Sequence, residues 1–161
     1  MALRTIRVEG DRVLTKNARE VKEVTEKERE LIRDMFDTMH EAEGVGLAAP
    51  QVGILKKIVV IEVEENEPIV LINPVITETE GSQTGSEGCL SVPGKVGTVT
   101  RPMKVVCEAV DENMAPIRVE GEGLLARCIC HEVDHLSGHL YTEIVEGPLQ
   151  DVEDLEEDGE E

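Results

Sequence analysis

Apolar residues recur every three or four positions between residues 25 and 43, which is the period of an amphipathic helix. Thr25 and Glu28 have the spacing of a capping box, and Gly44 stands where a glycine commonly ends a helix. The pattern predicts a helix over residues 25–43 with one buried face and one charged face. The apolar positions of the buried face are Leu31, Ile32, Met35, Phe36, Met39 and Ala42.

A second helix is predicted over residues 123–137, followed by Gly138. Its apolar residues cover a wide arc, so we expect most of its surface to be buried. It is unusual for a buried helix because it also carries His131 and His135. The apolar positions are Leu124, Leu125, Cys128, Ile129 and Val133.

Five short segments rich in β-branched residues lie between Pro, Gly and Asn, and they predict strands. No helix separates these strands, which favours antiparallel or mixed sheets in an α+β domain, here surrounding the central second helix. The segment GVGLAAPQVG at residues 44–53 contains too much Gly and Pro for a regular element and predicts a tight loop. The predicted strands are residues 56–63, 69–72, 75–79, 103–110 and 117–120.

The length of 161 residues suits one domain with one core. With one Phe, one Tyr and no Trp, that core must consist mainly of aliphatic side chains. The last eleven residues hold eight acids and no base, which predicts a flexible, solvated tail. We therefore expect a catalytic domain over residues 1–147 and an acidic tail over residues 148–161.

The net charge of -19 argues against nucleic-acid binding, which depends on Lys and Arg contacts to phosphates. The first residues have no apolar signal region, and no apolar run has membrane-spanning length. These features predict a cytoplasmic protein without a membrane partner. Its four cysteines are then expected to be free thiols, available as metal ligands or nucleophiles.

The strongest chemical motif is HExxH at residues 131–135, on the second predicted helix. Histidines four residues apart lie on one face, so His131 and His135 can bind a single ion. Glu132 lies about 100° away around the helix, where it can take a proton from a water molecule activated by that ion. This arrangement predicts metal-dependent hydrolysis.

The spacing of the motif does not determine which residue is the third protein ligand of the ion. The metzincin pattern is not met, because Tyr141 stands at the third histidine position. A downstream glutamate, Glu143 or Glu146, would make the chain a zincin-type metalloendopeptidase. Cys89 could instead present a thiolate from a loop in the segment EGCLS, while Cys128 and Cys130 are better explained as small buried residues.

Three segments together resemble the signature motifs of the peptide deformylases: GVGLAAPQ at 44–51, EGCLS at 87–91 and CHEVDHLSG at 130–138. Their order also matches, and the similarity runs from about residue 6 to residue 141. The family commonly has Gln immediately before the first metal histidine, whereas this chain has Cys130. The resemblance implies the peptide deformylase fold, an α+β domain with sheets around the HExxH helix.

The resemblance also assigns roles. It implies that Cys89, His131 and His135 bind Fe²⁺, often replaced by Zn²⁺, Ni²⁺ or Co²⁺, and that Glu132 is the general base and acid. Gln51 and the backbone N–H of Leu90 would stabilise the oxyanion. The implied reaction removes the N-formyl group from the initiator methionine of new polypeptides and releases formate.

A nascent peptide is the implied partner, with transient ribosome association, although the acidic C-terminus argues against docking to ribosomal RNA through the tail. Glycines at residues 44 and 46 would let an extended peptide approach and pair as a strand. Val45, Leu124 and Cys128 are expected to wall the methionine pocket. The candidate substrate-binding residues are Gly44, Val45, Gly46, Glu87, Gly88, Leu124 and Cys128.

Two further expectations concern a network of charged side chains and an alternative class of function. Glu87, Arg101 and Asp134 are predicted to form a charged network that orients the EGCLS segment and the metal-binding helix. A non-enzymatic binding module, in which the ion only stabilises the fold, is the alternative from another class.

Overall fold

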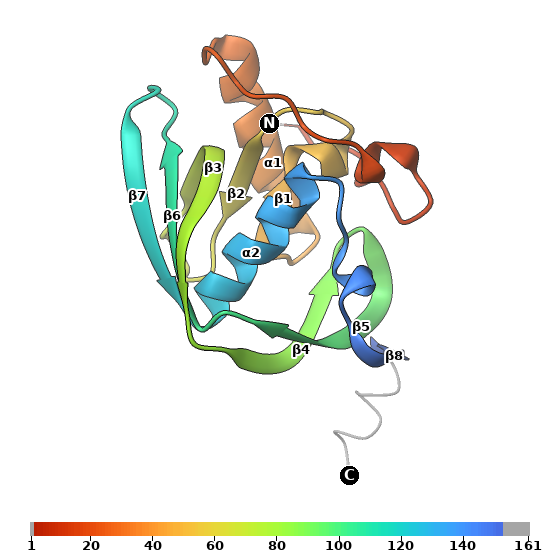
Figure 1. Cartoon of the computed structure of the whole chain (residues 1–161). Helices are drawn as coiled ribbons and strands as arrows, with labels where there is room; N and C mark the ends of the chain where they lie inside the picture. Colours follow the sequence, from red (N-terminus) through yellow and green to blue (C-terminus); the bar gives the residue numbers. More distant parts are fainter. Residues whose placement is uncertain (1, 153–161) are drawn as a thin grey trace.

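Helix α2 (Leu124–Leu136) lies between two antiparallel sheets in the computed structural model, which describes residues 2–152 (Figure 1). It packs against the first and last strands of the larger sheet. Most of its apolar residues pack with the inner face of that sheet, whereas Leu124 at its start is exposed. The predicted α+β arrangement around a central helix is confirmed.

The larger sheet has the strand order β1-β2-β3-β6-β7. The predicted strands at 69–72 and 75–79 are one long strand, β3, whose pairing with β6 is interrupted by two register shifts. The pattern split this strand because Pro74 stands in its middle, next to the irregular pairing. The bounds are β1 (Gly46–Ala48), β2 (Ile58–Ile61), β3 (Ile69–Glu80), β6 (Lys104–Val110) and β7 (Pro116–Glu122).

The smaller sheet has the order β4-β5-β8, and none of its strands was predicted. Strand β4 (Gln83–Cys89) ends at Cys89, so the prediction that Cys89 lies on a loop is wrong. Strand β8 (Glu146–Asp151) pairs with β5 (Val92–Arg101), so the ordered chain extends beyond the tail boundary predicted at residue 148. The rest of the predicted tail, residues 153–161, lies outside the described residues.

Helix α1 (Glu26–Glu41) begins at the predicted capping box, in which the backbone N–H and the hydroxyl of Thr25 donate to Glu28 Oε1 and the backbone N–H of Lys27 donates to Thr25 Oγ1. It packs against β1 and β2. The prediction of a loop over residues 44–53 is wrong in part, because this segment contains β1 and a 3-10 helix, η2 (Ala49–Val52). These residues are buried, and they bring the GVGLAAPQ segment against α2.

The N-terminal segment closes over the end of α2. Gly138 follows the helix at φ 78°, and a Cβ built there would lie 2.5 Å from the backbone oxygen of Thr15. The backbone N–H of Ala18 donates to the carbonyl of Leu136 at 2.8 Å. Two further 3-10 turns are η1 (Arg12–Thr15) and η3 (Tyr141–Glu143). Within residues 2–152, no helix has the length and apolar character needed to cross a membrane.

Candidate active site

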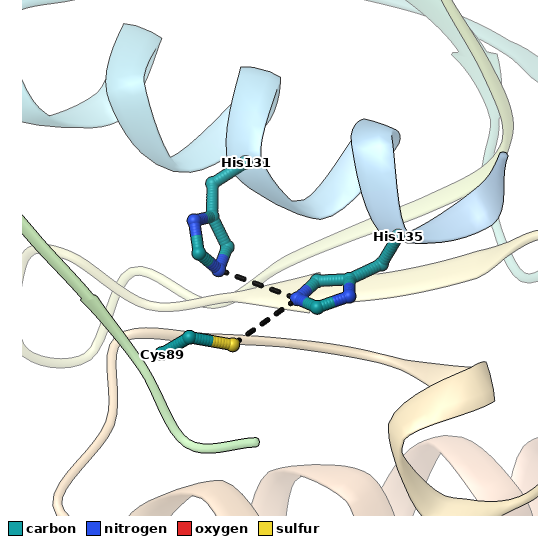
Figure 2. A group of neighbouring side chains, drawn as sticks. All are labelled: Cys89, His131 and His135. Atoms are coloured by element: carbon teal, nitrogen blue, oxygen red, sulfur yellow. Dashed lines mark hydrogen bonds between the residues drawn. The ribbon is translucent and has the colours of Figure 1, made fainter. Parts of the chain in front are cut away.

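The two helix histidines and Cys89 point toward one another (Figure 2). His135 Nε2 lies 3.3 Å from His131 Nε2 and 3.3 Å from Cys89 Sγ. The histidines come from α2 and the cysteine from the end of β4, so the smaller sheet must pack on the helix for the cluster to form. Both histidines are buried.

These three atoms suit one shared ion. Ligand atoms around a tetrahedral metal with bonds of about 2.0–2.3 Å are separated by about 3.3–3.8 Å. Two of the three separations are 3.3 Å, at the lower end of that range, and all three atoms lie within 4.8 Å of one another. Burial lowers the pKa of His135 to about 3, and the neighbouring His131 also favours the neutral imidazole, which is the form that binds metals.

The carboxylate of Glu132 lies beside this cluster, pressed against the backbone of β1. A Cβ built on Gly46 would lie 2.6 Å from Glu132 Oε2, so only glycine leaves room for this side chain. Burial raises the pKa of Glu132 to about 7. Its Oε1 atom is buried and has no hydrogen-bond partner among residues 2–152, which suits a group that meets water or substrate.

Gln51 is held in place by both ends of its amide. Its Oε1 accepts from the backbone N–H of Ala48 at 2.9 Å, and its Nε2 donates to Ser91 Oγ at 3.1 Å. The same Nε2 lies 3.6 Å from Cys89 Sγ. Since Gln51 is almost fully buried, its N–H group is a fixed donor next to the three-atom cluster.

Glu87 connects the cluster to two arginines. Its Oε2 accepts from His131 Nδ1 at 2.6 Å and from Arg101 at 2.7 Å, and Arg101 also donates to Asp134 at 2.7 Å. Its Oε1 accepts from Arg101 and from Arg127, both at 3.0 Å. Burial alone would raise the pKa of Glu87, but hydrogen bonds from His131 and Arg101 outweigh it and lower that pKa to about 2. The predicted charged network of Glu87, Arg101 and Asp134 is therefore present in the structure.

The histidine in this network is oriented by its partners. Burial works to lower the pKa of His131, while its contacts with Cys89 and Glu87 raise that pKa well above the usual value. When Nδ1 donates to Glu87, the lone pair of Nε2 is directed to the ligand cluster.

A cavity of about 510 Å³ opens on this site. Glu132, His131, Cys89 and Gln51 line it, and so does Leu90, whose side chain packs against Gly44. Val45 and Leu124 are exposed apolar residues at its wall. Every predicted substrate-binding residue lines this cavity: Gly44, Val45, Gly46, Glu87, Gly88, Leu124 and Cys128.

Sequence reasoning missed Arg127, which is buried in the same cluster. Its signal was available, because residue 127 stands one helical turn before His131 and so shares its face. Ser91, which fixes the amide of Gln51, was missed as well, because a serine in a Gly-rich segment has no distinctive pattern.

The structure places the other proposed ligands elsewhere. Glu143 accepts from the backbone N–H of Leu140 and contacts His139, and Glu146 accepts from Thr100. Cys128 and Cys130 are buried as predicted, and burial raises their thiol pKa values to about 12 and about 11.

Comparison with known proteins gives a consistent result. The family model described as polypeptide deformylase matches residues 3–150. The chain is 67% identical over 159 residues to the peptide deformylase of Agathobacter rectalis, across 98% of this chain and 100% of that protein. These similarities do not support the metalloendopeptidase alternative or a non-enzymatic module.

Solved structures agree. A peptide deformylase from Legionella pneumophila has a TM-score of 0.88 and 44% identity, covering 90% of this chain and 87% of that one. A peptide deformylase from Synechococcus elongatus, in complex with actinonin, has a TM-score of 0.85 and 48% identity, covering 88% of this chain and 78% of that one. The chain therefore belongs to the polypeptide deformylase family.

Proposed function

We propose that this deformylase hydrolyses N-formylmethionyl peptides with one divalent ion held by Cys89, His131 and His135, and with Glu132 as the proton carrier. The observation that carries the proposal is the buried carboxylate of Glu132 beside the three converging ligand atoms, at the wall of one cavity. Fe²⁺ is the proposed native ion, and the mixed sulfur and imidazole donors also suit Zn²⁺, Ni²⁺ and Co²⁺.

When bound, the ion supplies Lewis acidity, which lowers the pKa of a coordinated water molecule and polarises the formyl carbonyl. Glu132 accepts a proton from the attacking water molecule while the oxygen of that water forms a bond to the formyl carbon. Glu132 then donates that proton to the peptide nitrogen as the carbon–nitrogen bond breaks, and formate and the free amine leave. The raised pKa of Glu132 suits a group that must both accept and donate near neutral pH.

Gln51 is proposed to stabilise the negative charge that develops on the formyl oxygen, together with the backbone N–H of Leu90. The fixed orientation of the Gln51 amide supports this role, because a donor held by other contacts does not need to reorganise during the reaction.

The substrate backbone is proposed to pair with the open edge of β1. Strand β1 is at the edge of its sheet, and Ala48 directs its N–H away from β2 to Gln51. Because strand residues alternate, the backbone groups of Gly46 face the same open edge. Val45, Leu124 and Cys128 then form the apolar wall for the methionine side chain.

A nascent-chain substrate is consistent with a cytoplasmic location and transient contact with the ribosome. The net charge of -19 argues against direct binding to nucleic acid.

The decisive experiment measures formate release from formyl-Met-Ala-Ser together with bound metal, after anaerobic purification. Cys89→Ala is expected to lose both metal and activity. Cys107→Ala, which removes a buried cysteine of the large sheet outside the cluster, should keep both. Glu132→Gln is expected to keep the metal and lose at least about 10²-fold in rate.

A metal-loaded protein that releases no formate would contradict the proposal. Actinonin, which is bound in the Synechococcus elongatus structure, is expected to compete with the formylated peptide.

A further inference from the structure

Arg127 ties together the two segments that carry the candidate metal ligands. It belongs to α2, which also carries His131 and His135, and it binds Glu87 of β4, the strand that ends at Cys89. The Nη1–Oε1 distance is 3.0 Å, and both side chains are buried. The same carboxylate also contacts His131 Nδ1 of α2 at 2.6 Å, so Glu87 joins β4 to the helix through both residues.

The guanidinium of Arg127 is fixed by more than this pair. Nη1 also donates to the carbonyl of Val99 in β5 at 3.1 Å, and Nη2 lies 3.5 Å from the carbonyl of Gln83 at the start of β4. A planar group with several fixed donors can hold two strands and a carboxylate in one relative orientation. Lysine at this position would offer one nitrogen and could not span the same set.

Arg101 does not duplicate this function. It binds both oxygens of Glu87, but it is based on β5 and shares its charge with Asp134. Asp134 belongs to the last turn of α2, so Arg101 joins β5 and Glu87 to that end of the helix, whereas Arg127 joins Glu87, Val99 and Gln83 to the first turn. With both arginines present, two buried cations balance the two carboxylates, and His131 Nδ1 can donate to Glu87 Oε2 at 2.6 Å.

We propose that Arg127 is a positioning residue, which fixes Glu87 and through it the ring of His131, and so sets the spacing between the helix histidines and Cys89. This inference rests on the metal site of the proposed function. The hydrogen bonds of Arg127 go to Glu87, Val99 and Gln83, so its effect on the ion passes through Glu87.

The test measures the dissociation constant of Co²⁺ by visible absorbance, in competition with a chelator, for the full chain. Arg127→Met is expected to weaken binding by about 10–100-fold, the range found when a partner of a metal ligand is removed. The matched control is Arg118→Met, since Arg118 is an exposed arginine of β7 that pairs with Glu78 and Glu120. Its dissociation constant should stay within about 2-fold of the parent, because surface ion pairs have small effects.

A double-mutant cycle separates positioning from general support of the fold. Glu87→Gln keeps an acceptor for His131 but weakens the tie to Arg127. In that background Arg127→Met should change the dissociation constant by less than about 3-fold, because its partner is already altered. Equal fold-changes in the two backgrounds would show that Arg127 does not act through Glu87 and would overturn the proposal.

Two further measurements make the outcome unambiguous. If Arg127→Met does not fold, the same cycle is read with Arg127→Lys, where additive effects again overturn the proposal. The Nδ1 proton of His131, followed by NMR in the Zn²⁺-loaded protein, should exchange faster with solvent in the Arg127 variant and not in Arg118→Met. A parent chain that fails to bind Co²⁺ would overturn the metal site itself, whereas equal binding by parent and Arg127→Met would overturn the positioning role alone.

Discussion

Gly46 and Glu132 show how closely the backbone approaches the reacting groups. The space that a Cβ would take at residue 46 is occupied by the carboxylate of Glu132. Glycine is therefore required at residue 46 because any side chain there would displace Glu132. A special backbone conformation is not the reason, because the φ angle of Gly46 is not positive.

Gly46→Ala is expected to lower kcat by at least about 10-fold, because the new methyl group displaces the carboxylate that transfers the proton. Metal content should stay at the parent level, since the atoms nearest to a Cβ at residue 46 belong to Glu132 and not to His131 or His135. The measurement is formate release at saturating substrate, together with metal analysis. Gly85→Ala is the control, because its Cβ would meet Arg127 at an ordinary 3.6 Å, and a comparable loss there would contradict the explanation.

At the level of residues, sequence could predict the helix part of the site better than the strand part. HExxH fixes His131, Glu132 and His135 by helical geometry alone. Cys89 has no such local rule, since its distance from the histidines depends on how β4 packs against α2, and only the resemblance to a family favoured it over a downstream glutamate. Arg127 was missed because the sequence interpretation did not consider that a charged residue in an apolar helix lies on the same face as His131, one turn later.

Helix α1 is joined to the rest of the fold by Glu28. This side chain caps the helix and also accepts from Lys56 at 2.6 Å. The hydrogen bond from Lys56, followed by that from Thr25, lowers the pKa of Glu28 to about 2 from its ordinary value of 4.5. A carboxyl group with a depressed pKa in the folded state stabilises the fold above its unfolded pKa, and the stabilisation is lost as pH falls toward the folded value.

Glu28→Gln is therefore expected to be less stable than the parent at about pH 7, with a difference that shrinks as pH falls from about 4.5 toward 2. Glutamine keeps an acceptor for the helix cap, so the change reports mainly on the charged pair. Urea unfolding of both chains across this range measures the difference. Glu30→Gln, an exposed position of the same helix, serves as the control, and an unchanging Glu28 difference would contradict the linkage.

Gly138 fixes where α2 meets the N-terminal segment. Gly138→Ala is expected to cost more stability than Gly147→Ala, although the two glycines have nearly equal φ values of 78° and 81°. Both alanines meet backbone strain of about 1 kcal/mol or more, but only the first also meets the Thr15 carbonyl. Equal midpoints of urea unfolding for the two variants would rule out this contact as a constraint.

The elements that sequence could predict are those with a strong period. Helices α1 and α2 have buried apolar residues at helical spacing, β2 is a run of four buried β-branched residues, and β3, β6 and β7 are rich in β-branched residues, of which Ile117 and Val119 in β7 are half-buried. Strands β4 and β8 were missed because QTGSEGC and EGPLQD are mostly polar, and their pairing depends on partners far along the chain. Strand β1 has only three residues, too few for a period.

In the molecule as a whole, the candidate ligands connect the smaller sheet to the central helix. An ion bound there stabilises the folded state by mass action, because the unfolded chain does not hold the three ligands together. At a free ion concentration of about 100 times the dissociation constant, the expected gain is about 2.7 kcal/mol. Thermal unfolding with Zn²⁺ and with a chelator measures it, and Cys89→Ala should show little dependence on the ion.

Cys89 comes from a strand of the smaller sheet, whereas both histidines come from the helix α2. The helix alone therefore cannot carry the metal site into another protein. A synthetic peptide of residues 123–138 would carry both imidazoles and the glutamate but no thiolate, and it would bind Zn²⁺ far more weakly than the whole chain. Engineers who wish to graft this centre onto another scaffold must transplant a strand terminus and its anchoring arginines along with the helix.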